Sequence, residues 1–182
     1  TFSDLLKVSG LSHGTNVWTG NARDFHLGLK RGYPAVPFKD LIGCRDDIMV
    51  YLLDKNLPPS DAFKIMESVR KGKGISTDFE KEMLSYGVPK WYIESCKLIK
   101  YMFPKAHATA YVIMALRIGW FKIYAPIFYY ATYFSKRAKS FEVEIVVKGH
   151  TEINRKVLEY ASKIQNNTAT AKERNKHGSL LI

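Results

Sequence analysis

The chain has 182 residues, and its hydrophobic share of 46% allows one domain with a substantial core, with room for a loose end. Lysine and arginine number 28 against 17 aspartate and glutamate, a net charge of +11 that indicates a polyanionic partner, either nucleic acid or acidic membrane, or simply a solubilising surface. Two distant cysteines, Cys44 and Cys96, exclude a zinc motif and a disulfide framework, and are typical of reduced cytosolic thiols.

The N-terminal segment indicates a piece of a longer cytoplasmic protein. It begins with Thr1 rather than Met and shows no signal peptide. The pattern predicts a helix end over residues 1–8, stopped at Ser9–Gly10, and a loop from there to Asn21. A short helix over 21–29 and a surface connection over 30–37 are expected next.

Four helices are predicted in the middle of the chain. They span 44–55, 61–69 with Ser60 as N-cap, about 77–86, and 89–102. In the second of these helices, the residues expected to face inward are Phe63, Ile65, Met66 and Val69. Asp46 and Asp47 open the first helix, where the helix dipole favours carboxylates, so we do not interpret them as a metal pair.

The organising element is a long helix predicted from Lys105 to Tyr124, with Pro104 just before it. Its apolar residues occupy nearly every side, which predicts a helix wrapped by other elements. Arg117 interrupts the apolar run, which is too short for the roughly 20 residues of a membrane span. Lys105 and His107 in the first turn suggest an anion site at the free N–H groups.

The remaining chain is also predicted to be helical. A packed aromatic helix follows Pro126, residues 141–148 are ambiguous between strand and helix, 151–164 form a helix, and 165–182 are expected to be poorly ordered. We find no internal repeat and no convincing strand pair. The fold class predicted is all-α.

Candidate sites are cationic and glycine-rich. Arg70-Lys71-Gly72-Lys73-Gly74 can wrap a phosphate, although basic residues and glycine also end helices for purely structural reasons. Ser12 and His13 are adjacent, a poor geometry for a nucleophile and its base. Cations together with the rings of Tyr101, Phe103 and Tyr111 suggest a nucleotide pocket; Tyr111 shares a helix face with His107.

Four ordered blocks carry a family resemblance: SGLSHGTNVW, IGCRDDIMVYLL, AFKIMESVRKGKG and FPKAHATAYVIMALRIGWFKIYAPIFYYATYF. They resemble the PolC-type DNA polymerase III alpha subunit of low-GC Gram-positive bacteria and mycoplasmas, over about residues 1–137. The resemblance implies a multi-helix fingers region over 1–140, and a connector towards a C-terminal DNA-binding region over 141–182.

The resemblance also implies roles for particular residues. Those expected to bind the incoming deoxynucleoside triphosphate (dNTP) and the nascent base pair are Ser12, His13, Arg70, Lys71, Lys73, Lys105, His107 and Tyr111. Those expected to contact DNA are Arg45, Lys100 and Arg117. We expect no catalytic or metal-binding residue in this chain.

The resemblance further implies partners and a cofactor that act elsewhere in the protein. In that family the carboxylates that hold Mg²⁺ for phosphoryl transfer belong to the palm domain, so the chain alone is expected to be inactive and to bind no metal. Primer–template DNA, dNTP, the palm and thumb, and the sliding clamp through other regions are the implied partners; no membrane is expected. The alternatives are a stand-alone basic DNA-binding module and a peripheral membrane protein that uses residues 120–137.

Overall fold

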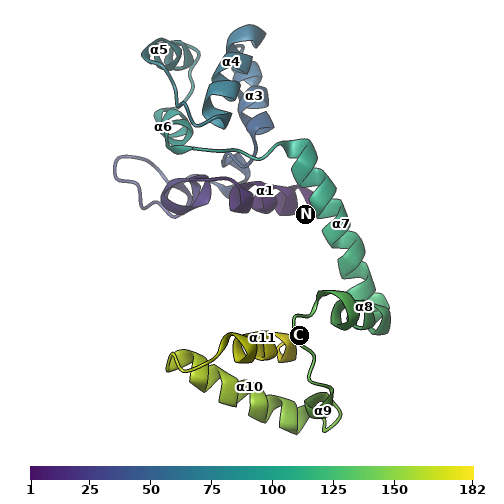
Figure 1. Ribbon diagram of the computed structural model, residues 1–182. Coiled ribbons are helices and arrows are strands. Elements are labelled where there is room, and N and C mark those ends of the chain that lie inside the picture. Colours follow the sequence, from purple (N-terminus) through teal and green to yellow (C-terminus); the bar gives the residue numbers. More distant parts are fainter. The chain divides into compact units, whose positions relative to one another are not determined.

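The computed structural model describes residues 1–182 and contains eleven α-helices with no β-strand, which confirms the predicted all-α fold (Figure 1). The chain divides into two compact units, Thr1–Ala115 and Leu116–Ile182. This division by packing lies within helix α7 (Lys105–Tyr124). The boundary expected after residue 140, between the fingers region and the connector, is a functional one and stays a prediction.

The N-terminal unit is built from short helices joined by tight turns (Figure 1). Its helices, besides the beginning of α7, are α1 (Phe2–His13), α2 (Arg23–His26), α3 (Arg45–Asp54), α4 (Pro59–Arg70), α5 (Thr77–Ser85) and α6 (Lys90–Leu98). Pro59 begins α4, where its missing N–H has no partner to lose, and the Ser76 hydroxyl caps α5 by accepting the Phe79 N–H. Local capping therefore determines several of the helix starts.

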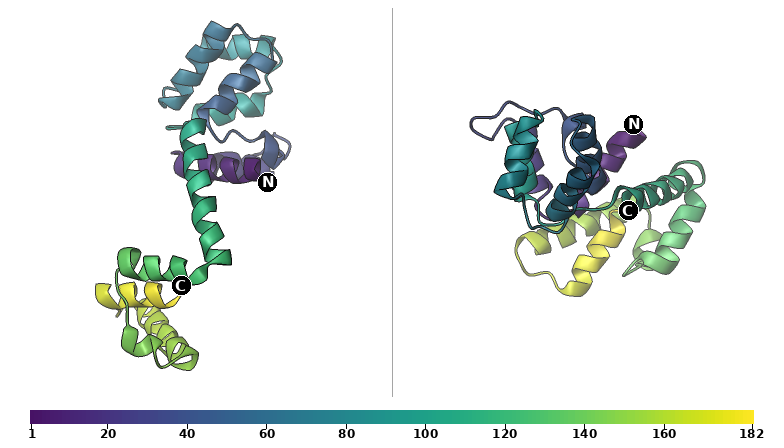
Figure 2. Two further views of the ribbon diagram at one scale, coloured as in Figure 1. Left: turned by 90° about the vertical axis from the view of Figure 1, so that its right-hand side faces the viewer. Right: turned by 90° about the horizontal axis from the view of Figure 1, so that it is seen from above.

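The main core of this unit is a cluster of buried apolar side chains to which α2, α3, α4 and α6 all contribute. On α4 the buried residues Ala62, Ile65, Met66 and Val69 recur at helical spacing and face α3, which lies beside α4 in both views of Figure 2. The inward orientation predicted for Ile65, Met66 and Val69 is confirmed. The same prediction for Phe63 is wrong, because its position falls off this stripe and it is 54% exposed.

Helix α1 continues past the predicted stop at Ser9–Gly10 and ends only at His13. The glycine serves packing rather than termination. A Cβ atom built on Gly10 would lie 2.6 Å from the Gly43 carbonyl oxygen, so only glycine lets α1 approach the start of α3 this closely. The predicted loop over Ser9–Asn21 is correspondingly shorter.

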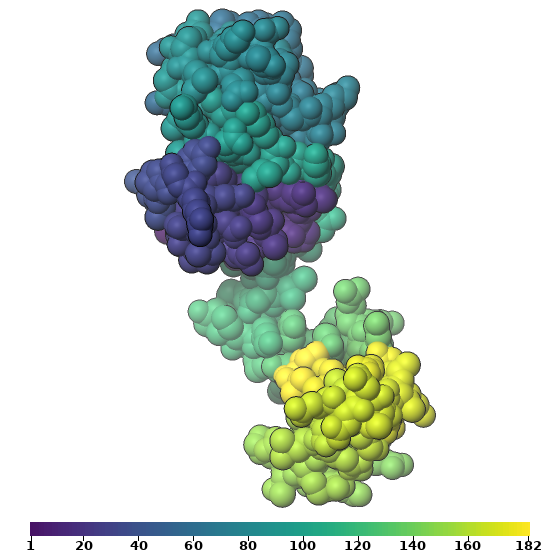
Figure 3. Space-filling model, turned by 90° about the vertical axis from the view of Figure 1, so that its left-hand side faces the viewer, coloured from purple at the N-terminus to yellow at the C-terminus, as the bar shows by residue number.

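Residues 99–104 form an extended segment between α6 and α7, here called the linker. The predicted helix over 89–102 is too long, since α6 ends at Leu98. Ile99 and Met102 point into the core, while backbone groups bond on both sides: the Thr15 N–H donates to the Tyr101 carbonyl at 3.0 Å, and the Arg45 N–H donates to the Phe103 carbonyl at 3.4 Å. In Figure 3 the teal surface of this region adjoins the purple surface of the N-terminal segment.

Helix α7 has the predicted bounds but not the predicted burial. Only Ala108 and Val112 are buried, in a small cluster with Leu6 and Cys44. Within the N-terminal unit, Tyr111 and Met114 are more than half exposed. Apolar residues on every side mean that a helix could be buried on every side. They do not show that other elements of the chain cover it.

The C-terminal unit comprises the end of α7, α8 (Pro126–Thr132), a π-helical turn (Tyr133–Arg137), α9 (Val143–Val146), α10 (His150–Gln165) and α11 (Ala171–Leu180). The ambiguous segment 141–148 therefore contains a helix. The tail predicted to be poorly ordered instead contains α11. A capping box formed by Thr170 and Glu173 begins this helix, and an ion pair of 2.7 Å between Lys163 and Glu173 joins it to α10. The aromatic helix is less packed than predicted, with Phe128 70% exposed.

No single helix has both the length and the apolar character needed to cross a membrane. Helix α7 and Pro126–Arg137 reach those values only together, as a pair bent by 119°.

Candidate functional site

Four aromatic rings gather where α1 ends and α7 begins. The His13 and Phe103 rings stack with their centroids 5.3 Å apart. His107 meets Phe103 edge-on at 4.8 Å, and Tyr111 meets His107 at 4.9 Å. The spacing of four residues between His107 and Tyr111 places both on one helix face, as the sequence predicts. His13, His107 and Tyr111 are exposed, so this aromatic cluster is open to a ligand.

Three cations gather around the carboxylate of Glu67 on α4. Arg70 donates to it through Nε and Nη2, each at 2.8 Å, and Lys71 Nζ lies 3.2 Å away. From α3, Arg45 Nη1 lies 3.6 Å from the same carboxylate. The hydrogen bonds from Arg70, followed by those from Lys71, lower the pKa of Glu67 to about 2, so the carboxylate is ionised throughout the neutral range.

Residues 71–74 after α4, here called the basic loop, pack directly on the linker. A Cβ atom on Gly72 would lie 2.4 Å from the Lys100 carbonyl oxygen, and the left-handed backbone at Gly72, with φ of 71°, favours glycine independently. Lys73 and Lys100 are exposed and take part in no ion pair. The loop and the linker therefore present these two free cations from adjacent segments.

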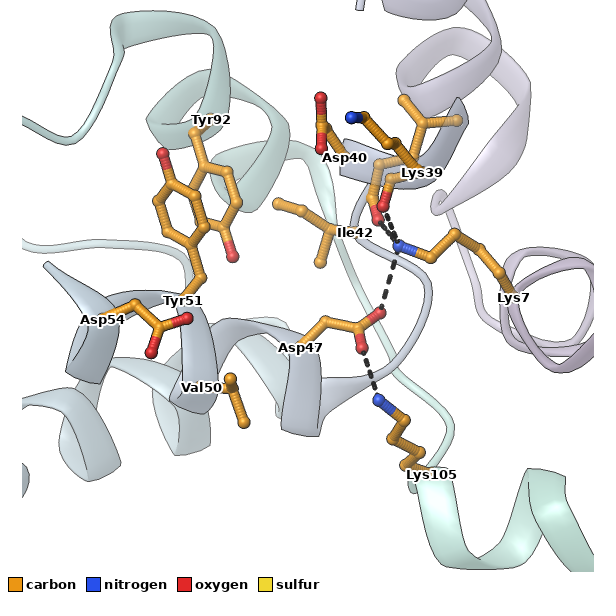
Figure 4. A pocket seen from close by; sticks show the side chains of 11 residues that line it. Lys7, Lys39, Asp40, Ile42, Asp47, Val50, Tyr51, Asp54, Tyr92 and Lys105 are labelled. Carbon is orange, nitrogen blue, oxygen red and sulfur yellow. Dashed lines mark hydrogen bonds and ion pairs between the residues drawn. The ribbon is translucent and has the colours of Figure 1, made fainter. Parts of the chain in front are cut away.

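Lys105 and the first turn of α7 are already engaged by carboxylates. Asp46 accepts the Lys105 backbone N–H at 2.8 Å, and Lys105 Nζ lies 3.3 Å from Asp47. Asp47 lies between Lys105 and Lys7, whose Nζ is 3.9 Å from its other oxygen (Figure 4). The free N–H groups that we expected at this helix start are thus partly satisfied from within the chain.

A small pocket includes Asp47 in its lining (Figure 4). It is lined by α3, by residues 39–42 before it, and by Lys7, Tyr92 and Lys105. The rings of Tyr51 and Tyr92 stack there with centroids 4.1 Å apart. Burial raises the pKa of the Tyr92 hydroxyl well above its ordinary value, so the group stays protonated. Positive and negative groups alternate in this pocket, which distinguishes it from the cation-rich surface around the linker.

Ser12 and Arg117, two of the predicted site residues, form no hydrogen bond or ion pair with the Glu67 carboxylate or the basic loop. The Ser12 hydroxyl lies 2.9 Å from His13 Nδ1, which also contacts the Ser9 carbonyl at 2.8 Å. These contacts belong to the last turn of α1. Arg117 belongs to the C-terminal unit, next to the exposed rings of Trp120 and Phe121.

Sequence reasoning missed Glu67 and the capping role of Asp46. Glu67 precedes Arg70 and Lys71 by three and four residues, the spacing at which side chains meet on a helix, so this signal was available. The contact of Asp46 with Lys105 joins residues 59 positions apart, and no local pattern indicates it. No three His, Cys, Asp or Glu side chains are grouped so that they could hold a metal ion.

Comparison with known proteins identifies the chain. Residues 1–90 match the family model described as the bacterial DNA polymerase III alpha subunit finger domain. A PolC-type DNA polymerase III from Oceanobacillus iheyensis is 54% identical over 175 residues, 96% of this chain and 12% of the relative. The chain belongs to the PolC-type DNA polymerase III family.

Further PolC-type relatives show the same pattern. The Bacillus subtilis protein is 55% identical over 160 residues, 87% of this chain and 11% of the relative. The Clostridium perfringens protein is 55% identical over 162 residues, 89% of this chain and 11% of the relative. The chain thus spans about an eighth or less of the length of these PolC-type relatives.

Proposed function

We propose that this chain serves as the fingers of a replicative DNA polymerase and binds the incoming dNTP and the nascent base pair during template-directed synthesis. The observation that supports the proposal is that cationic and aromatic side chains, the kinds that bind phosphates and bases, meet at the linker. The cations around Glu67 and the basic loop adjoin the linker on one side. The linker also contributes the ring of Phe103 to the aromatic cluster.

The cations would neutralise and position phosphate groups. Arginine presents a planar fork that matches phosphate oxygens, and lysine adds a mobile point charge. Arg70, Lys71 and Lys73 are the candidates for the triphosphate, and Arg45, Lys100 and Arg117 are the candidates for the DNA backbone. Contacts of this kind fix register and orientation without reading the base.

The aromatic cluster would contact the base pair. Exposed rings of His107 and Tyr111 offer flat surfaces on which a base can stack, an interaction that tolerates any base. Selection would then follow from the shape of the new pair against this helix face. Ser12 and His13, at the end of α1, would border the same space, and Lys105 would approach the nucleotide from the start of α7.

The chemical step would belong to the remainder of the polymerase. In-line phosphoryl transfer uses two metal ions that stabilise the attacking and leaving oxygens. The Mg²⁺ ligands are assigned to the palm, outside this chain, and the contribution of the fingers would be positioning. Primer–template DNA, palm, thumb and, through other regions, the sliding clamp are the partners that this role requires.

The test is fluorescence anisotropy of a labelled primer–template duplex titrated with the chain over a salt series, with and without the matched dNTP. Each phosphate contact adds about 0.9 to the slope of log affinity against log salt. Replacing Arg70, Lys71 and Lys73 together by glutamine is therefore expected to lower the slope by up to about 3. The matched control replaces three cations of the C-terminal unit, Lys148, Arg155 and Lys172.

The dNTP distinguishes a polymerase pocket from a general basic module. We expect the matched dNTP to strengthen DNA binding, and Tyr111→Ala and Lys105→Ala to remove that effect while duplex binding persists. Salt-sensitive binding that responds to neither the dNTP nor these variants would instead favour a stand-alone DNA-binding module. Absence of binding at low salt would refute the proposal for the isolated chain.

A further inference from the structure

We infer that Glu67 is a positioning residue that holds Arg45, Arg70 and Lys71 together as a preformed receptor for a phosphate group. The inference rests on the proposed function and adds to it a residue of the opposite charge. Nothing in the sequence pattern of phosphate sites requires a carboxylate here, since carboxylate and phosphate repel each other. The geometry explains why this carboxylate is present.

Glu67 connects cations that come from two helices. Arg70 and Lys71 end α4, and Arg45 begins α3. Each is a long side chain with many rotamers, and ordering it for a ligand is unfavourable unless something orders it beforehand. The bond between Arg70 and Glu67 is bidentate, a contact that fixes the guanidinium plane as well as its position.

Glu67 is the least exposed side chain of the four. Its side chain is 20% exposed, against 26% for Arg70, 34% for Arg45 and 52% for Lys71. A phosphate arriving from solvent would therefore meet the cations first. An internal competitor for the phosphate site would instead be the most exposed member of the group.

The cluster keeps unused capacity for an anion. Arg70 uses Nε and Nη2 for Glu67, which leaves its Nη1 without a partner in the chain. Arg45 Nε also lacks a hydrogen-bond partner, but it is buried and out of reach of a phosphate that arrives from solvent. Three cations around one carboxylate leave a net charge of +2, or +1 when Asp46, 3.8 Å from Arg45 Nε, is counted. Unpaired donors and residual positive charge are what a phosphate would satisfy.

The test uses Glu67→Gln, because two explanations of Glu67 predict opposite signs. If Glu67 only adds negative charge, its removal strengthens phosphate binding several-fold. If it positions the cations, removal weakens binding by about 5- to 20-fold, the effect of disordering Arg70 and Lys71, the two cations closest to Glu67, and lowers the salt slope by about 1. Glu67→Asp keeps the charge and should restore part of the affinity.

The phosphate can belong to DNA or to a nucleotide, so the assay has two arms. Anisotropy of the labelled primer–template duplex reports the DNA phosphates, and calorimetric titration with tripolyphosphate reports a triphosphate without base or sugar. Glu94→Gln, which removes a carboxylate that pairs with Lys97 on α6, is the charge-matched control and should leave both affinities unchanged.

A third readout does not depend on binding. In the unaltered chain the Arg70 Nε–H should give a slowly exchanging side-chain NMR signal, and Glu67→Gln should broaden or remove it. Unchanged arginine signals, or unchanged or tighter phosphate binding, would overturn the inference while the proposed function stands. If the unaltered chain shows no salt-sensitive binding in either arm, the proposed function fails and phosphate is overturned as the ligand.

Discussion

Replacing Gly72 by alanine tests how the basic loop is held against the linker. Gly72 has φ of 71°, a left-handed conformation that costs an alanine about 1–2 kcal/mol. Its new methyl group would lie 2.4 Å from the Lys100 carbonyl oxygen, which belongs to the backbone and cannot rotate away. Overpacking of this kind adds about 1–3 kcal/mol, so the total expected destabilisation is about 2–5 kcal/mol.

Gly74 provides the matched control, because it lies in the same loop with φ of 74° and a Cβ atom added to it would have nothing within 4 Å. Gly74→Ala should therefore show only the conformational term of about 1–2 kcal/mol. Urea unfolding followed by far-ultraviolet circular dichroism measures both free energies, and hydrogen exchange of the α4 amides restricts the comparison to the N-terminal unit. Equal destabilisation by the two substitutions would refute the steric part of the reasoning.

Three further predictions follow from carboxylates and thiols. Asp46→Ala removes the acceptor of the Lys105 N–H and should lower the free energy of unfolding by about 0.5–2 kcal/mol in urea, with no change contradicting the capping role. The hydrogen bonds from Arg70 depress the Glu67 pKa to about 2, so the stability that Glu67 contributes should be complete above its unfolded pKa near 4.5 and disappear as pH falls towards 2. The difference in unfolding free energy between the unaltered chain and Glu67→Gln, measured against pH, should shrink over that window; a difference independent of pH would exclude this ion pair as its source. Burial, followed by the charges of Asp47 and Asp46, raises the Cys44 pKa to about 11, and burial alone raises that of Cys96, so both thiols should react with a disulfide reagent at pH 8 only when the chain unfolds. Rapid reaction of either thiol in the folded chain would contradict the described packing.

The helices were largely predictable because their signals are local. Ser76 caps α5, and the α4 stripe of Ile65, Met66 and Val69 has helical spacing. The predicted start of α4 is wrong, because the helix begins at Pro59 and Ser60 lies inside it instead of capping it. Predictions failed where distant segments decide the outcome. Gly10 resembles a helix stop until Gly43 is seen against it, and the end of α6 depends on the bond between Thr15 and Tyr101.

The candidate site shows the same division. The shared face of His107 and Tyr111 follows from a spacing of four residues. The stacking of His13 on Phe103 joins residues from the two ends of the N-terminal unit, and composition alone cannot reveal it. The prediction that α7 is buried was wrong for a related reason, since the apolar composition of a helix does not indicate which other element, if any, covers it.

The linker has a practical consequence for engineering. Its path is set by backbone bonds to Thr15 and Arg45 and by two buried residues, whereas the side chains of Lys100 and Tyr101 are exposed and form neither an ion pair nor a core contact. Replacing either side chain should leave the path of the linker unchanged, but Lys100 is a candidate DNA contact, so Tyr101 is the position to label. A fluorophore or photocrosslinker installed at Tyr101 would lie between the basic loop and the end of α1, where it could report ligand arrival without remodelling the scaffold.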